Sequence, residues 1–544
     1  MSKFYQVGSV SDLKDGEKKE VELENGSKIL LAKLNGKFLA TSSNCTHYGA
    51  PLKNGVLSPE GRITCPWHGA CFDMHTGDIE DAPAIDAIFA FKTSVKDDKV
   101  YIDATEADLK AGRRMPSCAA KNAKTTDERV VVIGGGASAA TCIESLREYG
   151  YEGAITAISS EPYYPIDRTK ISKALITDAS KIEMRNQKFY QELDIDFRKN
   201  ETVESVDVSA KNVKLASGST VSYSKLIVAT GGTPKRLPMD GFDLDNVFLL
   251  RNIEHAQNIV SSRDARPSND KETRKNIVIV GSSFIGMEAA FANADKHNVV
   301  IVGQEKYPLE SVLGPQVGKQ LQASAESKGV KFHMEAGVEK ALPSKADPKS
   351  AGTVCLKDGT QLPCDLVILG VGVAPATKFL DGQVKLEDDG GIAVDEYLQV
   401  KGQNDIYAIG DIAHFPYTGP GATGKPIRIE HWSVAENHGR AVAKTLAGKK
   451  APFTNIPYFW SAQGAQLRYC GNNSPTVGWD DIVIQGDLKE TKFAGFYTKG
   501  EQVVAVVSMG YDPAVSKSAE LMRRSMMPSK TELKNGTDVR ELVF

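Results

Sequence analysis

The sequence has few cysteines for its length and no long apolar run. Eight cysteines are spread over 544 residues, which excludes the disulfide framework of small secreted domains. No stretch reaches the roughly 18 consecutive apolar residues that a transmembrane helix requires. The N-terminus, MSKFYQVGSV, lacks both the apolar core of a secretory signal and the Arg/Ser-rich composition of a transit peptide. These absences predict a cytoplasmic protein without a membrane span, with a mitochondrial location as the alternative.

The sequence also lacks a large excess of positive or negative charge. The formal net charge is −3, and no block of like charge stands out, which argues against a nucleic-acid partner held by phosphate contacts. No period of about 20–50 residues repeats, so a solenoid is excluded. The length is too great for one hydrophobic core and predicts three or four domains.

The pattern of apolar and polar residues changes several times along the chain. Short alternating segments punctuated by Gly and Asp or Asn indicate an all-β unit first, and a polar stretch without periodicity then indicates a linker. Two later units, RVVVIGGG and KNIVIVGSS, read as a buried strand, glycines and a helix, which is typical of doubly wound nucleotide-binding domains. The predicted boundaries are 1–104 for the all-β domain, 105–128 for the linker, 129–250 with 372–455 for the first doubly wound α/β domain, 251–371 for the second, and 456–544 for a C-terminal α+β domain.

Two Cys/His pairs in the first domain carry the strongest chemical signal. Cys45 and His47 are followed after 17 residues by Cys65 and His68, so thiolate and imidazole alternate. A Rieske [2Fe–2S] cluster needs two thiolates on one iron and two imidazoles on the other. A Cys₂His₂ zinc site is the competing interpretation, but zinc-finger spacing groups the cysteines before the histidines. The pattern favours the iron–sulfur cluster, with these four residues as its ligands.

This first segment resembles the Rieske ferredoxin family over residues 1–104. Members from respiratory complexes carry a disulfide between the two ligand loops, where this chain has Ala50 and Trp67, and a serine that donates to a sulfide, where it has Ala70. The resemblance therefore implies fewer hydrogen bonds to the cluster. We expect a reduction potential near the low end of the Rieske range, roughly −150 mV.

The first strand–glycine–helix unit has the spacing of a dinucleotide fingerprint. Gly134 allows the tight turn, Gly136 lets a pyrophosphate approach the helix N-terminus, and Ala139 keeps helix and strand close. Glu161 ends the second strand of this unit, where a carboxylate binds a ribose hydroxyl. Two later segments fit the same domain: LIVATGG, which contains Gly231 and reads as its return strand, and NDIYAIGD, which ends in Gly410 and Asp411.

Residues 129–544 resemble the pyridine-nucleotide-dependent flavoprotein reductases. The nearer branch contains the ferredoxin reductases of oxygenase systems and the apoptosis-inducing factors, whose marker segment appears here as YPIDRTKISK, residues 164–173. The resemblance implies that this domain binds FAD, that Asp411 lies near the ribityl and phosphate groups, and that Arg168 and Lys173 face the flavin. No cysteine pair occurs between Cys142 and Cys355, so thiol–disulfide chemistry through such a pair is excluded.

The second fingerprint, GSSFIGME, resembles the NAD-binding signature of the same reductases. Gly281 and Gly286 hold the positions of the family glycines, whereas Ser283 replaces the middle one. The added Cβ stands where the pyrophosphate passes closest, although the hydroxyl is a possible phosphate donor.

The ribose acceptor in the second domain is less well marked. Relatives that prefer NAD end the second strand with Glu, where this chain has Gly303, and Glu305 and Lys306 follow shortly after. Glu305 suits a 2′-hydroxyl and Lys306 a 2′-phosphate. The sequence favours NADH, with NADPH as the alternative.

The resemblance also implies roles for residues around the reacting rings. Phe284 screens the nicotinamide side of the flavin, and Glu288 pairs with Lys173 beside it, so that this pair tunes the flavin rather than transferring protons. His431 and Trp432 start a helix whose N-terminus lies by the flavin pyrimidine. Trp460 opens the C-terminal domain and lies over the flavin or nicotinamide.

In order and modules the whole chain resembles the Rieske-containing, apoptosis-inducing-factor-like oxidoreductases of type 3. The prediction is electron transfer from NAD(P)H through FAD to the chain's own cluster and on to an unidentified acceptor. A redox-controlled signalling protein and an NAD(P)H oxidase with an ancillary cluster are the alternatives, and a homodimer is possible.

The geometry of the transfer is also predicted. His47 and His68 are expected to point toward a flavin edge bordered by Trp460 and the start of the helix at His431. The linker is expected to act as a flexible tether of roughly 25–30 Å.

Overall fold

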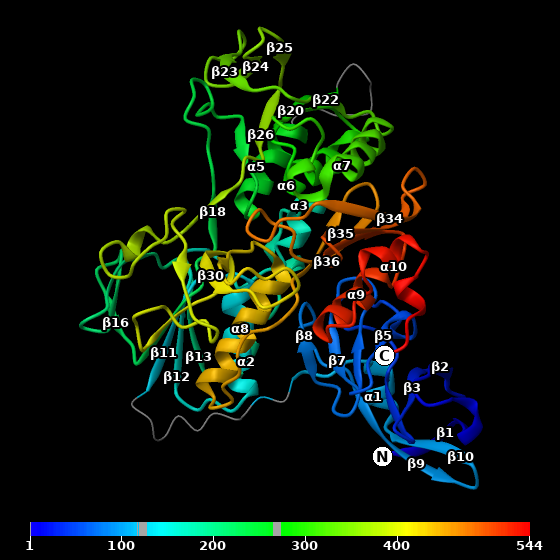
Figure 1. The fold of residues 1–544 in the computed structure, drawn as a ribbon. Coiled ribbons are helices and arrows are strands. Elements are labelled where there is room, and N and C mark those ends of the chain that lie inside the picture. Colours follow the sequence, from blue (N-terminus) through cyan, green and yellow to red (C-terminus); the bar gives the residue numbers. More distant parts are fainter. Residues whose placement is uncertain (1, 117, 119–127, 265–273) are drawn as a thin grey trace.

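The computed structural model describes residues 2–116, 118, 128–264 and 274–544. Its sheets fall into four groups along the chain, and Figure 1 shows the blue N-terminal group lying against the red C-terminal helices. No helix of the described residues is long and apolar enough to cross a membrane.

The N-terminal domain is antiparallel throughout. A six-stranded sheet forms its base, in the order β1 (Lys3–Ser9), β10 (Lys99–Ala104), β9 (Ala90–Lys96), β4 (Lys37–Ser42), β3 (Lys28–Leu34) and β2 (Lys18–Glu22). A smaller sheet carries β5 (Val56–Leu57), β6 (Arg62–Thr64), β7 (Cys71–Asp73) and β8 (Ile79–Asp81). The short helix α1 (Glu106–Ala111) follows the last strand.

The first doubly wound domain is built on a five-stranded parallel sheet. Its order is β13 (Ile195–Arg198), β12 (Ala154–Ile158), β11 (Arg129–Ile133), β17 (Lys225–Val228) and β29 (Ile406–Ala408). The run VVVI of β11 is fully buried because parallel sheets are covered on both faces. The helices α2 (Ala137–Glu148) and α8 (Trp432–Leu446) pack against each other beside it. Short elements complete the domain: α3 (Thr169–Ala174), α4 (Gln187–Glu192), the meander β14 (Val203–Asp207), β15 (Asn212–Leu215) and β16 (Thr220–Ser222), and the small sheet β28 (Ile392–Ala393), β30 (Ala413–Pro416) and β31 (Pro426–Ile427).

The second doubly wound domain is inserted into the first. Two antiparallel strands, β18 (Gly232–Pro234) and β27 (Val373–Pro375), carry the chain out and back. The inserted parallel sheet has the order β19 (Val247–Leu249), β26 (Leu366–Leu369), β20 (Asn276–Val280), β21 (Asn298–Val302) and β22 (Lys331–His333). Helices α5 (Ile253–Asp264), α6 (Phe284–Ala294) and α7 (Glu310–Glu326) and the meander β23 (Val338–Pro343), β24 (Ala351–Leu356) and β25 (Gln361–Pro363) accompany it.

The C-terminal domain joins the other parts. Its antiparallel sheet runs in the order β32 (Tyr458–Ala462), β33 (Gln466–Gly471), β36 (Gln502–Met509), β35 (Lys492–Lys499) and β34 (Asp481–Asp487), with helices α9 (Ala514–Arg523) and α10 (Lys530–Lys534) after it. In Figure 1 this sheet lies between the green inserted domain and the blue N-terminal domain. The edge strand β32 is therefore placed where the cluster domain and the nucleotide domains approach each other.

Candidate functional site

The two predicted ligand loops have the same backbone design. In the first loop, the Cys45 N–H donates to the Ala50 carbonyl at 2.8 Å; in the second, the Cys65 N–H donates to the Ala70 carbonyl at 2.7 Å. Both cysteines are buried. A hydrogen bond between the two thiols raises the pKa of Cys45 and lowers the pKa of Cys65. The two loops therefore close on each other and bring the two sulfurs together.

The two predicted histidine ligands also meet. The Nδ1 atoms of His47 and His68 lie 3.1 Å apart. Burial lowers the pKa of His47 to about 4 and that of His68 to about 2, so both imidazoles are neutral at pH 7, as a metal ligand must be. Among the described residues, no three His, Cys, Asp or Glu side chains gather around one metal position. A sulfur pair beside a nitrogen pair suits a two-iron cluster better than one tetrahedral zinc ion.

The strand β32 separates two chemical environments. Successive side chains of a strand point to opposite faces, and here Tyr458 and Trp460 face the N-terminal domain. The Trp460 ring lies 4.5 Å from the His68 ring and 5.4 Å from the His47 ring, measured between centroids. On the opposite face, the Phe459 ring lies 4.4 Å from the His431 ring.

The Trp460 ring lies against both histidines of the ligand loops, a contact that the resemblance did not imply. Its predicted place over the flavin or nicotinamide stays a prediction. Phe459, one residue earlier, faces Phe284 at a centroid distance of 5.0 Å. Trp432, predicted beside the flavin, is the first residue of α8, and His431 is its N-cap.

Hydrogen bonds from the C-terminal domain hold the second ligand loop in place. The Ser516 hydroxyl donates to the Cys65 carbonyl at 2.8 Å, and Arg468 Nε donates to the Trp67 carbonyl at 2.8 Å. The Tyr458 ring lies so close to Gly69 that a Cβ there would come within 2.8 Å of it. Glycine at position 69 thus permits the close approach of the two domains as well as the turn of the loop.

Buried ion pairs complete this interface. Arg185 of the first doubly wound domain reaches Asp86 of the cluster domain and Glu144 of α2, each at 2.7 Å, and all three side chains are at most 11% exposed. On the other side, Arg62 of β6 reaches Glu520 of α9 at 3.4 Å. Buried pairs of this kind fix geometry because removing one partner leaves a costly unpaired charge.

The interface adds direct contacts to the predicted linker. Residues 117 and 119–127 of the predicted 105–128 segment lie outside the described residues. The Arg185 and Glu520 contacts join the cluster domain to the rest of the chain directly, and the role of the linker as a tether stays a prediction.

Tyr48 adds a contact that sequence reasoning missed. Its ring stacks on His47 at 3.7 Å, and its hydroxyl donates to Asp167 Oδ2 at 2.6 Å. Asp167 belongs to the marker segment of residues 164–173, which is predicted to face the flavin, so the contacts of Tyr48 link a predicted cluster ligand to that segment. Tyr48 follows His47 directly in the sequence, but nothing in the pattern indicates its partner.

The predicted Lys173–Glu288 pair is present, and Glu288 is the buried partner. Lys173 Nζ lies 3.1 Å from Glu288 Oε1, and Glu288 is 3% exposed. The carboxylate also accepts from the Ser172 and Ser461 hydroxyls, at 2.5 Å and 2.6 Å, and from the Ala462 N–H at 3.1 Å. This carboxylate therefore joins α3, α6 and β32. Sequence reasoning missed the two serines.

The first fingerprint lies between β11 and α2, as its sequence predicts. Gly136 is the N-cap of α2, and Ala139 is fully buried within it. A Cβ at Gly134 would lie 2.2 Å from the Ala229 carbonyl. Glu161, the predicted ribose acceptor, pairs with Arg168, so two residues expected to face the cofactor contact each other.

A second group of predicted flavin contacts gathers at the end of β29. Arg251 reaches Asp411 Oδ2 at 3.2 Å, and a Cβ built on Gly231 would lie 3.1 Å from Arg251 and 3.8 Å from Asp411. Gly410 lies between α2 and α8: a Cβ there would lie 2.9 Å from the Ser138 hydroxyl of α2, and its N–H donates to His438 Nδ1 of α8 at 3.2 Å. The structure thus brings Gly231, Gly410 and Asp411 to one edge of the first sheet.

The second fingerprint connects β20 to α6. A Cβ at Gly286 would lie 2.1 Å from the Gly281 carbonyl, so only glycine lets the helix approach the strand this closely. Ser283 is the N-cap of α6, and its hydroxyl donates to the Gly370 carbonyl at 2.9 Å. This hydroxyl therefore joins the start of α6 to the end of β26, and a bond from it to phosphate stays a prediction.

Glu305 is engaged elsewhere than predicted. Its two carboxylate oxygens accept from the Glu310 and Ser311 N–H groups at the start of α7, at 3.2 Å and 3.1 Å. The position that relatives fill with Glu is Gly303, where a Cβ would lie 2.7 Å from the Ser282 hydroxyl. The contacts of Glu305 therefore favour a helix-capping role over the predicted ribose contact.

The matching family profiles cover almost the whole chain. They are the Rieske [2Fe–2S] domain at residues 3–92, pyridine nucleotide-disulphide oxidoreductase at 128–439, and the reductase C-terminal domain at 458–543. The middle profile alone spans more than half of the sequence. The chain belongs to the pyridine nucleotide-disulphide oxidoreductase family. It is an NAD(P)H-dependent flavoprotein oxidoreductase that carries FAD and a Rieske [2Fe–2S] cluster.

Individual relatives agree with this assignment. Human apoptosis-inducing factor 3 is 37% identical over 534 residues, covering 97% of this chain and 85% of that protein. Rhodocoxin reductase from Rhodococcus erythropolis is 30% identical over 75% of this chain and 92% of its own length. The crystal structure of the covalent putidaredoxin reductase–putidaredoxin complex superposes with a TM-score of 0.68 at 26% identity, covering 75% of this chain and 96% of that one.

None of the eight cysteines forms a disulfide in the structure. Cys45 and Cys65 are the predicted cluster ligands, and Cys142, in the helix that follows the first fingerprint, is fully buried. The multidomain prediction, with a Rieske domain, two Rossmann-like domains and a C-terminal domain, is confirmed together with the predicted cofactors.

Proposed function

We propose that electrons from NAD(P)H reach the chain's own Rieske cluster across the face of β32 and leave from there to an acceptor. The observation that carries this proposal is the Trp460 ring, which packs on both predicted histidine ligands. FAD, when bound, would accept two electrons from NAD(P)H and pass them one at a time to an iron–sulfur cluster. The contact supports transfer within one docked chain.

The residues on the reductase side of β32 have a different task in this proposal. Phe284 orders the nicotinamide side, and the Lys173–Glu288 pair sets the charge beside the flavin. The Ser172 and Ser461 hydroxyls donate to the Glu288 side chain and fix its position. No side chain in this group needs to act as a general acid or base.

The remaining predicted contacts hold the two nucleotides. We assign the FAD pyrophosphate to the N-terminus of α2 and the NAD(P)H pyrophosphate to the N-terminus of α6, because both helices begin directly after a glycine-rich turn. Arg168, Glu161 and Asp411 are assigned to the FAD side. Trp432 and His431 border the flavin from the start of α8.

The relatives support the direction of electron flow. The names of two of them, rhodocoxin reductase and putidaredoxin reductase, describe enzymes that reduce a small electron carrier. In this chain the corresponding carrier is fused and docked, so the external acceptor takes its electron from the Rieske domain. The cytoplasmic location, the mitochondrial alternative and the homodimer stay predictions, which fractionation and sedimentation check.

The decisive experiment removes the Trp460 ring, which the proposal places between the flavin and the cluster. The variant Trp460→Leu should slow cluster reduction after NADH is mixed with the anaerobic enzyme by at least tenfold, while the bleaching of the flavin band keeps its rate. Stopped-flow absorbance at the flavin and cluster bands separates the two steps. Trp460→Phe keeps an aromatic ring and should lose less.

A second tryptophan provides the matched control. Trp67 directly precedes His68; its ring lies 6.4 Å from the His68 ring, measured between centroids, and the residue is 36% exposed. Trp67→Leu should leave both steps unchanged. Equal slowing by Trp460→Leu and Trp67→Leu, or no slowing by either, would contradict the proposed route.

A further inference from the structure

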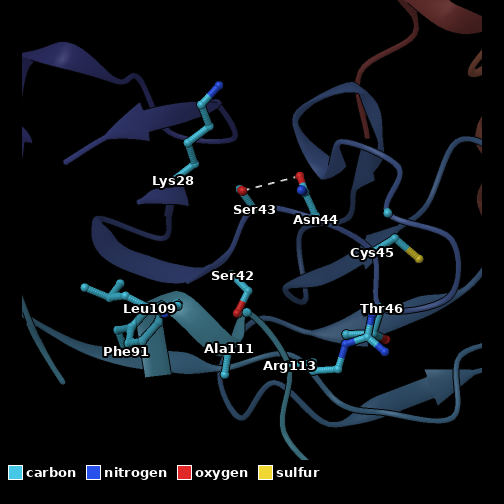
Figure 2. A pocket seen from close by; sticks show the side chains of 13 residues that line it. Lys28, Ser42, Ser43, Asn44, Cys45, Thr46, Phe91, Leu109, Ala111 and Arg113 are labelled. Carbon is cyan, nitrogen blue, oxygen red and sulfur yellow. Dashed lines mark hydrogen bonds between the residues drawn. The ribbon is translucent and has the colours of Figure 1, made fainter. Parts of the chain in front are cut away.

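A polar pocket lies beside the first ligand loop. It has a volume of about 380 Å³ and reaches from the end of β4, at Ser42 and Ser43, to the loop after α1. Cys45 contributes to its wall, but Figure 2 shows the sulfur pointing away from Lys28 and Ser43. The pocket therefore touches the backbone of a predicted cluster ligand without exposing the sulfur.

Positive charge dominates the lining of this pocket. Lys28, Lys110 and Arg113 line it, and no Asp or Glu does. Two of these cations have acidic neighbours outside the lining: Arg113 lies 3.4 Å from Asp86, and Lys28 lies 3.6 Å from Glu20.

The remaining cation and the uncharged lining complete a site for an anion. No ion pair of Lys110 is found among the described residues. The hydroxyls of Ser42 and Ser43 and the amide of Asn44 add hydrogen-bonding groups from the loop itself, and Figure 2 shows these three residues and Arg113 around the same space. Cations with polar neutral donors are the chemistry that binds carboxylate or phosphate oxygens.

We propose that this pocket binds a small multivalent anion, of the carboxylate or phosphate class, and that binding is coupled to the cluster. This inference goes beyond the electron route and relies only on the presence of the cluster in the first domain. Reduction adds one negative charge on the other side of the Cys45 backbone, so the anion binds the oxidised form more tightly. By linkage, the bound anion must lower the reduction potential.

The site lies directly beside one predicted cluster ligand. Thr46, next to Cys45, lines the pocket, and its hydroxyl donates to the Asp86 carbonyl at 2.5 Å. Asp86 is also the residue that Arg185 binds across the domain interface. An occupant of the pocket is thus placed next to the backbone of a predicted cluster ligand.

Citrate is a suitable probe, tested on the full-length enzyme at constant ionic strength. We expect calorimetric binding that is about tenfold tighter for the oxidised than for the dithionite-reduced enzyme. In a redox titration followed by EPR, saturating citrate should then lower the midpoint by about 59 mV, the value of a tenfold ratio for one electron. Lys110→Glu should abolish both the binding and the shift.

An exposed lysine of the same domain provides the control. Lys96 lies at the end of β9 and does not line the pocket, so Lys96→Glu should bind citrate and shift the midpoint as the wild type does. Equal loss in both variants would show a diffuse charge effect and overturn the proposal, as would a midpoint that citrate leaves unchanged. NADH-driven cluster reduction, measured in parallel, tests the electron route separately.

Discussion

One face of β32 contacts the cluster domain, and the other face contacts the nucleotide-binding domains. Toward the cluster, Trp460 presents a ring to His47 and His68; toward the nucleotides, Ser461 presents a hydroxyl to Glu288. Neighbouring residues thus serve two cofactors because a strand turns successive side chains to opposite sides. The comparison teaches that one edge strand couples the fused cluster domain to the reductase, and that single substitutions along it should affect one half at a time.

The largest expected effect comes from breaking the contact between the cluster domain and the first doubly wound domain. Arg185→Ala leaves the buried Glu144 carboxylate without its guanidinium and removes the contact to Asp86. Loss of one partner from a buried pair costs about 3–5 kcal/mol. Thermal unfolding followed by the visible circular dichroism of the cluster should show a lower midpoint.

An exposed pair on the neighbouring helix serves as control for Arg185. Lys188 and Glu192 of α4 are 3.5 Å apart and largely solvent-exposed, so Lys188→Ala should change stability by less than about 1 kcal/mol. If both variants unfold at the wild-type temperature, the ion pair does not stabilise the interface.

Ser461→Ala should affect the nucleotide face alone. It removes a 2.6 Å hydrogen bond to the Glu288 carboxylate, and a bond to a charged group contributes about 1.5–3 kcal/mol. We expect hydride transfer from NADH to slow roughly tenfold, the equivalent of about 1.4 kcal/mol, with cluster reduction keeping its intrinsic rate. Slowing of the cluster step instead would show that the two faces are not independent.

Acid should weaken the first doubly wound domain through a buried histidine. Burial lowers the pKa of His438 to about 3, against about 6.5 in an unfolded chain. The unfolded state therefore takes up the proton first, so this contribution is complete above pH 6.5 and is lost as the pH falls toward 3; at pH 5 the loss is roughly 2 kcal/mol.

The release of flavin fluorescence on heating measures this pH effect. His438→Gln should flatten the decline of the release temperature between pH 7 and pH 5. A decline as steep as that of the wild type would assign the acid sensitivity to other groups.

Tyr458→Phe should give the smallest effect. The hydroxyl of this residue lies 3.2 Å from the Ser516 hydroxyl, which in turn donates to the Cys65 carbonyl. One neutral hydrogen bond contributes about 1 kcal/mol, so cluster stability should fall slightly and hydride transfer should not change. A changed hydride rate would mean that this side of β32 also reaches the nucleotide site.

The sequence predicted much of this arrangement because the informative residues lie close together along the chain. The alternating Cys/His pairs and the two glycine fingerprints are local patterns, and each determines a turn or ligand set on its own. Local patterns could not predict contacts between residues far apart in the sequence. Ser461 contacts Glu288 across 173 residues, and Tyr48 contacts Asp167 across 119. The Lys173–Glu288 pair was expected only through the family resemblance.

The contacts that the sequence did not reveal have physical causes of the same kind. The motif around Trp460 does not show which face of β32 the ring occupies, because one step along a strand reverses the face. The buried pairs made by Arg185 and Arg62 join segments that only the folded chain brings together. The bond from the Glu310 N–H to Glu305 depends on the path of the loop before α7.

The most direct test of the account is to cut the chain between the cluster domain and β11 and to follow electron transfer after NADH is added. A specific protease site inserted before residue 128 allows the cut in the assembled enzyme. If the interface around Trp460, Arg185 and Glu520 holds the domains, the two pieces stay associated and cluster reduction keeps a first-order rate that dilution does not change. A rate that falls in proportion to protein concentration would contradict the account.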